Sequence, residues 1–198
     1  MNILMGRKNM QKHKPEVLVF AGPNGSGKST ITEYIDIVGE YINADDIKRS
    51  IFCTDEEAAK RATKRKEELI EAKEDFTFET VFSSSINVNL LKNAKENGYF
   101  IKAFFVLTAN AEINVLRVAA RVADGGHDVP VDKIRKRYVG SLGNLKELVK
   151  VADVLHVYDN TEDSPYRIYK KKRAEELYWE TAVWSKGKIE ELIGHNLC

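Results

Sequence analysis

Short apolar runs alternate with longer amphipathic segments along most of this chain. A continuous apolar run predicts a buried strand, whereas apolar residues spaced three and four apart predict a helix. This alternation predicts an α/β, three-layer fold with a mainly parallel sheet. The strand pattern occurs at residues 17–21, 41–42, 76–82, 99–107 and 154–158, and the helical pattern at residues 29–38, 55–75, 86–96, 111–123 and 131 to about 151.

The two ends of the chain depart from this alternation. Residues 1–14 are basic and polar, so we expect a disordered lead-in rather than a secretory signal. Residues 166–184 are expected to form a hairpin with a basic turn, and a last helix is expected near residues 188–193. The pattern therefore predicts a single domain over residues 15–198.

A glycine-rich stretch, GPNGSGKST, joins the first predicted strand to the first predicted helix. It matches G-x-x-x-x-G-K-[ST], the P-loop pattern, in its strand–loop–helix context. In such a loop backbone N–H groups and a helix N-terminus bind phosphate, the lysine reaches the β- and γ-phosphates, and the serine hydroxyl binds Mg²⁺. The alternative is a glycine-rich turn without a ligand. The expected nucleotide-binding residues are Gly22, Pro23, Asn24, Gly25, Ser26, Gly27, Lys28, Ser29 and Thr30, with Lys28 also catalytic and Ser29 also the metal ligand.

Composition narrows the classes of partner. Lys plus Arg total 31 and Asp plus Glu total 30, so no basic field favours nucleic-acid binding. Cys53 and Cys198 suggest neither a disulfide framework nor a zinc cluster and fit a reducing, cytoplasmic compartment. No apolar run reaches the roughly 18 residues that a membrane helix needs, so no membrane partner is expected.

Two carboxylates, Asp45 and Asp46, follow the short predicted strand at residues 41–42. Ligands of open α/β sheets bind at the carboxyl ends of strands, so one of these carboxylates could face the phosphates. The alternative is helix capping, because either Asp can cap a helix that begins near Ile47. The two interpretations are compatible if one carboxylate caps the helix and the other faces the cleft.

Glu79 interrupts the otherwise apolar and β-branched run at residues 76–82. A carboxylate within a buried strand is unfavourable unless it has a partner or lines a cleft. We therefore expect Glu79 to line the cleft. The alternative is an edge strand in which Glu79 faces water.

Four arginines flank a Gly-Gly loop. Arg117 and Arg121 share a face of the helix before the loop, and Arg135 and Arg137 lie beside the apolar stripe of the helix after it. The arrangement predicts a small helical lid, about residues 117–137, that closes with arginines onto a transferring phosphoryl group. The alternative for each arginine alone is a solvated surface residue.

Several segments, in their order along the chain, resemble the zeta-toxin family of P-loop kinases. The segments are GPNGSGKST, INADDIK, FTFET, RVADGGHDVP with IRKRY behind it, and YDN, within roughly residues 17–160. The better match is to the compact chromosomal branch. The resemblance implies phosphoryl transfer from ATP or GTP, with Mg²⁺, to the 3′-hydroxyl of a nucleotide sugar such as UDP-N-acetylglucosamine. A protein antitoxin is the partner that such a toxin would have.

The family's motifs also imply roles for individual residues. The catalytic-base Asp of the family falls on Asp45, and its substrate-binding Glu falls on Glu79. The lid arginines fall on Arg121 or Arg117, and on Arg135 in the second lid helix. Arg117 is also expected to contact the substrate.

Ser83 and His127 complete the expected substrate-binding set. The chain departs from the better-known toxins at Val81 and Ser83, where those toxins have Thr and Arg. This departure predicts weaker binding of UDP-N-acetylglucosamine and leaves two alternatives open. One is a kinase for another hydroxyl compound, such as a nucleoside, sugar or antibiotic. The other is a nucleotide-dependent switch without acceptor chemistry.

Overall fold

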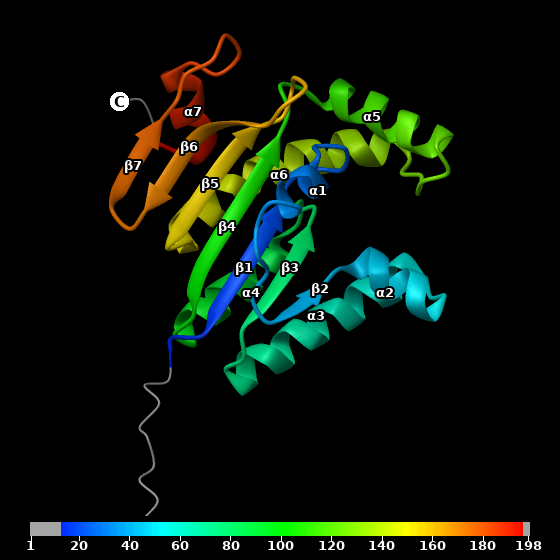
Figure 1. Ribbon diagram of the computed structural model, residues 1–198, viewed down its shortest axis with the longest axis vertical. Coiled ribbons are helices and arrows are strands. Elements are labelled where there is room, and N and C mark those ends of the chain that lie inside the picture. The colour runs from blue at the N-terminus through cyan, green and yellow to red at the C-terminus, as the bar shows by residue number, and fades with distance from the viewer. Residues whose placement is uncertain (1–12, 196–198) are drawn as a thin grey trace, which may run out of the picture.

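A single mixed sheet organises the protein (Figure 1). The computed structural model describes residues 13–195, so the expected lead-in at residues 1–14 lies almost entirely outside the described residues. The strands are β1 (Glu16–Ala21), β2 (Glu40–Ile42), β3 (Phe76–Thr80), β4 (Phe100–Leu107), β5 (Val154–Asp159), β6 (Tyr166–Lys172) and β7 (Glu175–Tyr178). The helices are α1 (Lys28–Thr32), α2 (Ala44–Ile51), α3 (Asp55–Ala72), α4 (Ser85–Glu96), α5 (Ala111–Ala123), α6 (Val131–Val151) and α7 (Lys186–Ile193).

The described sheet has seven strands in the order β2-β3-β1-β4-β5-β6-β7. The five strands from β2 to β5 in this order pair in parallel, and β6 and β7 add an antiparallel hairpin. The mainly parallel α/β fold predicted from the alternation of elements is confirmed. Because parallel strands end at the same edge, the segments that follow β1, β2, β3 and β5 meet at one edge of the sheet.

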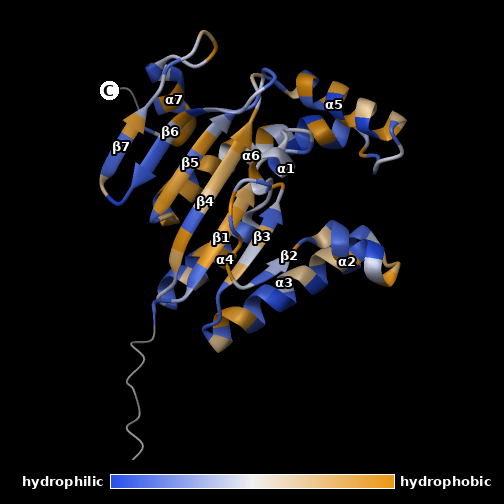
Figure 2. Cartoon of the chain, in the orientation of Figure 1, coloured by the Kyte–Doolittle hydropathy of each residue, from blue (hydrophilic) through white to orange (hydrophobic). Residues whose placement is uncertain are grey.

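The two faces of the sheet are covered unequally. Helices α3, α4, α6 and α7 pack on one face, where Phe76, Phe78 and Phe105 belong to the main hydrophobic core. The opposite face has a smaller core in which Ile31 of α1 contacts the cluster around Phe20. The strands in the middle of the sheet are strongly hydrophobic, as buried parallel strands should be (Figure 2). The third layer is thus reduced to one short helix.

The helix boundaries that differ most from the sequence predictions are those of α1, α2 and α3, and α3 ends at Ala72 rather than at residue 75. Helix α1 was expected to span residues 29–38 but ends at Thr32, because Ile35 and Val38 leave the helix and pack against the smaller core. Helix α2 begins at Ala44, not near Ile47, and its cap is Asn43, whose side chain accepts a hydrogen bond from Asp45 N–H. Asparagine is among the best N-cap residues, and the acidic first turn suits the helix dipole.

Helix α5 and the first turns of α6 form a subsidiary unit beside the sheet, whereas the rest of α6 belongs to the main core on one face of the sheet (Figure 1). Both helices have the bounds that the sequence predicted, and the unit encloses a small core of its own, made by Val118, Val129 and Ile134.

Within residues 13–195, no helix is both long and apolar enough to cross a membrane.

Candidate active site

The glycine-rich loop begins at the carboxyl end of β1, and the fold encloses it closely. Gly22 N–H donates to Thr80 C=O at 3.2 Å, and a Cβ atom on Gly22 would come within 2.1 Å of Val106 C=O. Gly27 has a positive φ of 85° at the start of α1, and a Cβ atom there would lie 2.0 Å from Asn160 Nδ2. Only glycine fits such positions without strain.

A long-range hydrogen bond holds the turn of this loop. Asn160 follows β5, and its Nδ2 donates to Ser26 C=O at 2.8 Å. Arg117 in turn donates to Asn160 C=O at 2.6 Å and to Thr161 C=O at 3.1 Å. Arg117 was expected at the substrate, but the structure places it in these backbone contacts behind the loop.

Lys28 is buried at the first turn of α1. Its Nζ donates to Gly22 C=O at 3.0 Å and lies 3.7 Å from Glu79 Oε1. Burial lowers the pKa of Lys28 below its ordinary value, although the Glu79 and Asp45 carboxylates act in the opposite direction. These two carboxylates stabilise the protonated form of Lys28, and a bound phosphate would do the same.

Glu79 lies inside the sheet rather than on an edge strand, because β3 pairs with both β1 and β2. Its side chain has partners: Lys28 on one oxygen, and on the other the Tyr41 hydroxyl, which donates at 3.2 Å. Burial and the Glu79 charge raise the pKa of Tyr41 to about 12, so Tyr41 remains a donor at neutral pH. Tyr41 was not among the residues predicted from the sequence.

The two adjacent aspartates have different surroundings. Asp45 lines the cavity in front of Lys28, whereas Asp46 forms an ion pair with Arg49 in the next turn of α2. Neither caps the helix, since Asn43 does so. The structure thus directs one carboxylate toward the cleft and the other along the helix surface.

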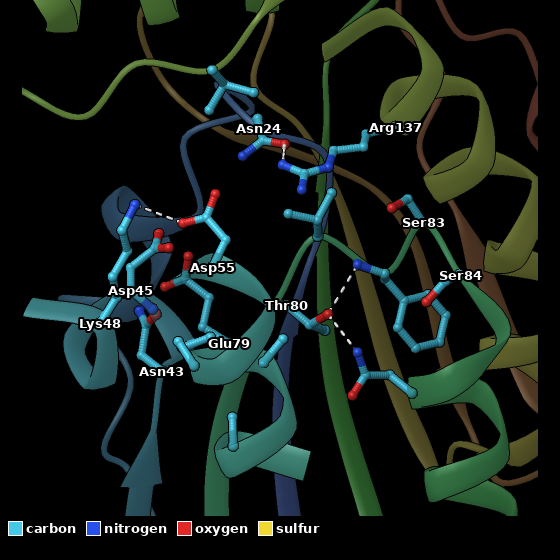
Figure 3. A pocket seen from close by; sticks show the side chains of 18 of the residues that line it. Asn24, Asn43, Asp45, Lys48, Asp55, Glu79, Thr80, Ser83, Ser84 and Arg137 are labelled. Atoms are coloured by element: carbon cyan, nitrogen blue, oxygen red, sulfur yellow. Dashed lines mark hydrogen bonds and ion pairs between the residues drawn. The ribbon is translucent and has the colours of Figure 1, made fainter. Parts of the chain in front are cut away.

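The arginines of the predicted lid also differ in their surroundings: some line the cavity and others do not. Arg121 lines the cavity, and its guanidinium donates to His127 C=O at 2.8 Å, so that it is tied to the Gly-Gly loop. Arg135 instead forms an exposed ion pair with Glu112 at 2.8 Å. Arg137, two residues further, lines the cavity and donates to Asn24 Oδ1 at 3.1 Å (Figure 3). It lies three residues after buried Ile134, on the same face of α6.

These groups surround one cavity of about 320 Å³. Figure 3 shows its polar lining, with Asp45, Asp55 and Glu79 gathered on one side and Arg137 with Asn24 on another. Ser83 and His127, both expected at the substrate, line the same cavity. Lys48, which pairs with Asp55 at 2.6 Å, and Lys66 were missed by the sequence interpretation.

The expected metal ligand, Ser29, is exposed in the first turn of α1. Among the described residues, no group of three or more acidic, histidine or cysteine side chains forms a metal cage. Mg²⁺ bound to nucleotide needs only one or two protein oxygens, since phosphates and waters supply the rest. The exposed Ser29 hydroxyl beside the P-loop fits such a role.

Comparisons with known proteins agree with the motifs. The Zeta toxin family profile matches residues 2–174. An uncharacterized protein of Haemophilus influenzae is 31% identical over 140 residues, which are 68% of this chain and 100% of that protein.

Solved structures share the fold at low sequence identity. A chain of the AvrRxo1-ORF1:AvrRxo1-ORF2 complex with ATP has a TM-score of 0.68 at 14% identity, over 95% of this chain and 66% of that chain. This chain therefore spans slightly less than two thirds of that relative. A chain of the PezAT chromosomal toxin-antitoxin system of Streptococcus pneumoniae has a TM-score of 0.56 at 16% identity, over 98% of this chain and 84% of that one. The profile match and the shared fold confirm the resemblance seen in the motifs, and the chain belongs to the zeta-toxin family.

Proposed function

We propose that the protein is a kinase that transfers the γ-phosphoryl group of ATP or GTP to a hydroxyl of a nucleotide sugar such as UDP-N-acetylglucosamine. The observation that carries the proposal is the convergence of Lys28, Asp45 and Glu79 on one cavity, with Lys28 Nζ 3.7 Å from Glu79 Oε1. Membership of the zeta-toxin family supports a phosphotransferase. ATP in the AvrRxo1 complex supports a nucleoside triphosphate as donor.

On the donor side, the loop N–H groups and Lys28 bind the phosphates. Lys28 Nζ now donates to Gly22 C=O, and phosphate oxygens take the place of that carbonyl when nucleotide binds. Ser29 holds Mg²⁺, which when bound neutralises charge on the β- and γ-phosphates. Arg121 and Arg137 border the cavity and stabilise the negative charge on the transferring phosphoryl group. Arg117 and Arg135 could do so only after leaving their present partners, the Asn160 carbonyl and the Glu112 carboxylate.

On the acceptor side, Asp45 orients the hydroxyl and accepts its proton as the new oxygen–phosphorus bond forms and the bond to the β-phosphate oxygen breaks. Glu79 accepts hydrogen bonds from acceptor hydroxyl or amide groups, and Tyr41 fixes its orientation. Catalysis then consists mostly of positioning and charge stabilisation, because the transition state of phosphoryl transfer is loose.

The exposure of Asp45 to the cavity favours this proposal over a nucleotide-dependent switch, since a switch needs no general base. Another small hydroxyl compound is the second candidate acceptor. A protein antitoxin is the partner we propose on the ground that the PezAT relative belongs to a toxin-antitoxin system.

The test is a transfer assay in which ATP and a panel of nucleotide sugars, nucleosides and sugars are incubated with the protein and read by mass spectrometry. We expect Asp45→Asn to lose about 10²–10⁴-fold in rate with nearly unchanged ATP affinity, because a general base contributes that much. Asp46→Asn is the matched control and should be mild. Equal rates in Asp45→Asn and the wild type would contradict the assignment, and absence of any phosphorylated acceptor would favour the switch.

A further inference from the structure

Lys66 of α3 is a buried lysine in the wall of the active-site cavity. Its exposed fraction is only 5%. Its Nζ donates to Asn87 Oδ1 at 2.7 Å and lies 4.6 Å from the centre of the Phe78 ring. Both of these partners are uncharged, and among residues 13–195 no carboxylate lies within ion-pair distance of Lys66 Nζ. The charge of the adjacent Glu67 acts on Lys66 without pairing with it, and its effect on the pKa is smaller than that of burial.

The other basic side chains of α3 are all neutralised by nearby carboxylates. They lie on the outer surface of the helix, where such pairs are common and weakly stabilising. Lys66 therefore differs from its neighbours both in burial and in the lack of a counter-charge. The outer pairs are Lys60 with Glu56, Arg61 with Glu57, Lys64 with Glu68, and Arg65 with Glu40.

A buried cation without a counter-ion is unfavourable, because protein dipoles replace its hydration shell only in part. Burial lowers the pKa of Lys66 to about 8, so the side chain is still mostly protonated at neutral pH. An anion bound in the cavity would provide the missing charge. Its binding would be strengthened by the low dielectric of the site.

The residues around Lys66 also suit an anion. Asn87 Nδ2 donates to Thr80 Oγ1 at 2.9 Å, which turns Asn87 Oδ1 toward the lysine. Ser83 and Ser84 lie on one side of the cavity, apart from Asp45, Asp55 and Glu79 on the other side (Figure 3). Ser84 caps α4 without a side-chain hydrogen bond to the helix, so the partial positive charge of the α4 N-terminus adds to that of Lys66.

We propose that Lys66, with Asn87 and the N-terminus of α4, forms a subsite that binds a phosphate group carried by the acceptor. Ser84 at the N-terminus of α4 lies across the cavity from Asp45 and Glu79 (Figure 3), and Lys66 contacts Asn87 in the first turn of the same helix. An acceptor would therefore place its hydroxyl at the carboxylates and its phosphate at this subsite. This inference rests on the proposed function for the existence of an acceptor. The anion-binding property of the subsite can nevertheless be measured without phosphoryl transfer.

The experiment is a calorimetric titration of inorganic pyrophosphate into protein saturated with the Mg²⁺ complex of the non-hydrolysable analogue AMP-PNP, at fixed free Mg²⁺. Saturation occupies the P-loop, so pyrophosphate reports on the remainder of the cavity. We expect wild-type protein to bind pyrophosphate and Lys66→Met to bind it about 10- to 100-fold more weakly, the usual loss of a charge-assisted contact. Lys66→Arg should retain most of the affinity.

Two further variants separate an anion subsite from a structural lysine. Lys64→Met removes an exposed lysine from the same helix and should leave pyrophosphate binding unchanged. Asn87→Asp keeps Lys66 but gives it an internal counter-charge, so it should weaken pyrophosphate binding without unfolding the protein. If Lys66→Met folds poorly, the pyrophosphate affinity of Asn87→Asp still shows whether Lys66 belongs to an anion-binding subsite.

The proposal is overturned if wild-type protein does not bind pyrophosphate, or if Lys66→Met or Asn87→Asp binds it as tightly as wild type. Failure of the proposed function looks different. In that case no acceptor is phosphorylated in the transfer assay, while the pyrophosphate affinities of the variants still differ as stated.

Discussion

At the scale of the residue, burial of an ionised side chain makes Lys66 a local source of instability. Burial lowers the pKa of Lys66 to about 8 in the folded protein, against 10.5 for an ordinary lysine. Between these two pH values the unfolded chain binds more protons than the folded protein, so the contribution of Lys66 to stability rises with pH. Below pH 8 the folded protein carries the full penalty of the buried charge.

Lys66→Met should therefore be more stable than wild type near neutral pH, and the difference should shrink as pH rises. The expected change in the stability difference is about 2 kcal/mol between about pH 7 and about pH 9.5. Urea unfolding of both proteins at the two pH values measures it. Titration of the tyrosines contributes equally to the free energy of unfolding of both proteins and cancels in the difference. Lys64→Met is the control and should show no such trend with pH. A stability difference that is constant with pH would argue against a buried charge at Lys66.

Residues such as Lys66 and Arg137 mark the limit of inference from the sequence. The glycine-rich loop could be placed because its spacing is local and its context is a single strand and helix. By contrast, α3 contains five basic residues within a run of seven, and only the packing of α3 against the sheet decides which of them is buried. Likewise, Arg135 and Arg137 both lie beside an apolar stripe, and a rotation of α6 by a fraction of a turn would exchange their surroundings.

At the scale of the element, the α5–α6 unit is expected to be less stable than the sheet. Its own buried core consists of Val118, Val129 and Ile134, and regions with little buried apolar surface open more readily. The helix bounds were predicted correctly because amphipathic periodicity, Asn110 at the start of α5 and the Gly-Gly sequence are strong local signals. Helix α1 was too long in the prediction because its β-branched residues are stabilised by tertiary packing instead.

We expect backbone amides of residues 124–129 to exchange hydrogen for deuterium much faster than those of β4 in the nucleotide-free protein. Arg121 is held to this loop through His127 C=O, so closure over the phosphates would move the arginine and the loop together. Addition of ATP with Mg²⁺ should slow exchange in the loop, as measured by mass spectrometry. Amides of residues 87–96 in α4 provide the comparison within the same experiment. Protection of the loop equal to that of β4 without nucleotide would speak against a moving lid.

At the scale of the whole molecule, the P-loop conformation depends on contacts from distant parts of the chain. Ser26 C=O receives its hydrogen bond from Asn160, and Arg117 holds the backbone of Asn160. Gly22 N–H is bound by Thr80 C=O of β3. Three parallel strands therefore fix one loop, which explains why a short local motif needs this fold to present its N–H groups toward a ligand.

The last prediction follows from this dependence. Asn160→Ala leaves Ser26 C=O buried without its donor and removes the side chain that confines Gly27, although Asn160 is not part of the glycine-rich motif. An unsatisfied buried acceptor costs about 1–3 kcal/mol, so we expect a lower melting temperature together with roughly 5- to 100-fold weaker ATP binding. Asn89→Ala, which removes an exposed asparagine from α4, is the matched control. If Asn160→Ala lowers the melting temperature but binds ATP as well as Asn89→Ala does, the loop holds its conformation without β5, and the coupling across the sheet inferred here is absent.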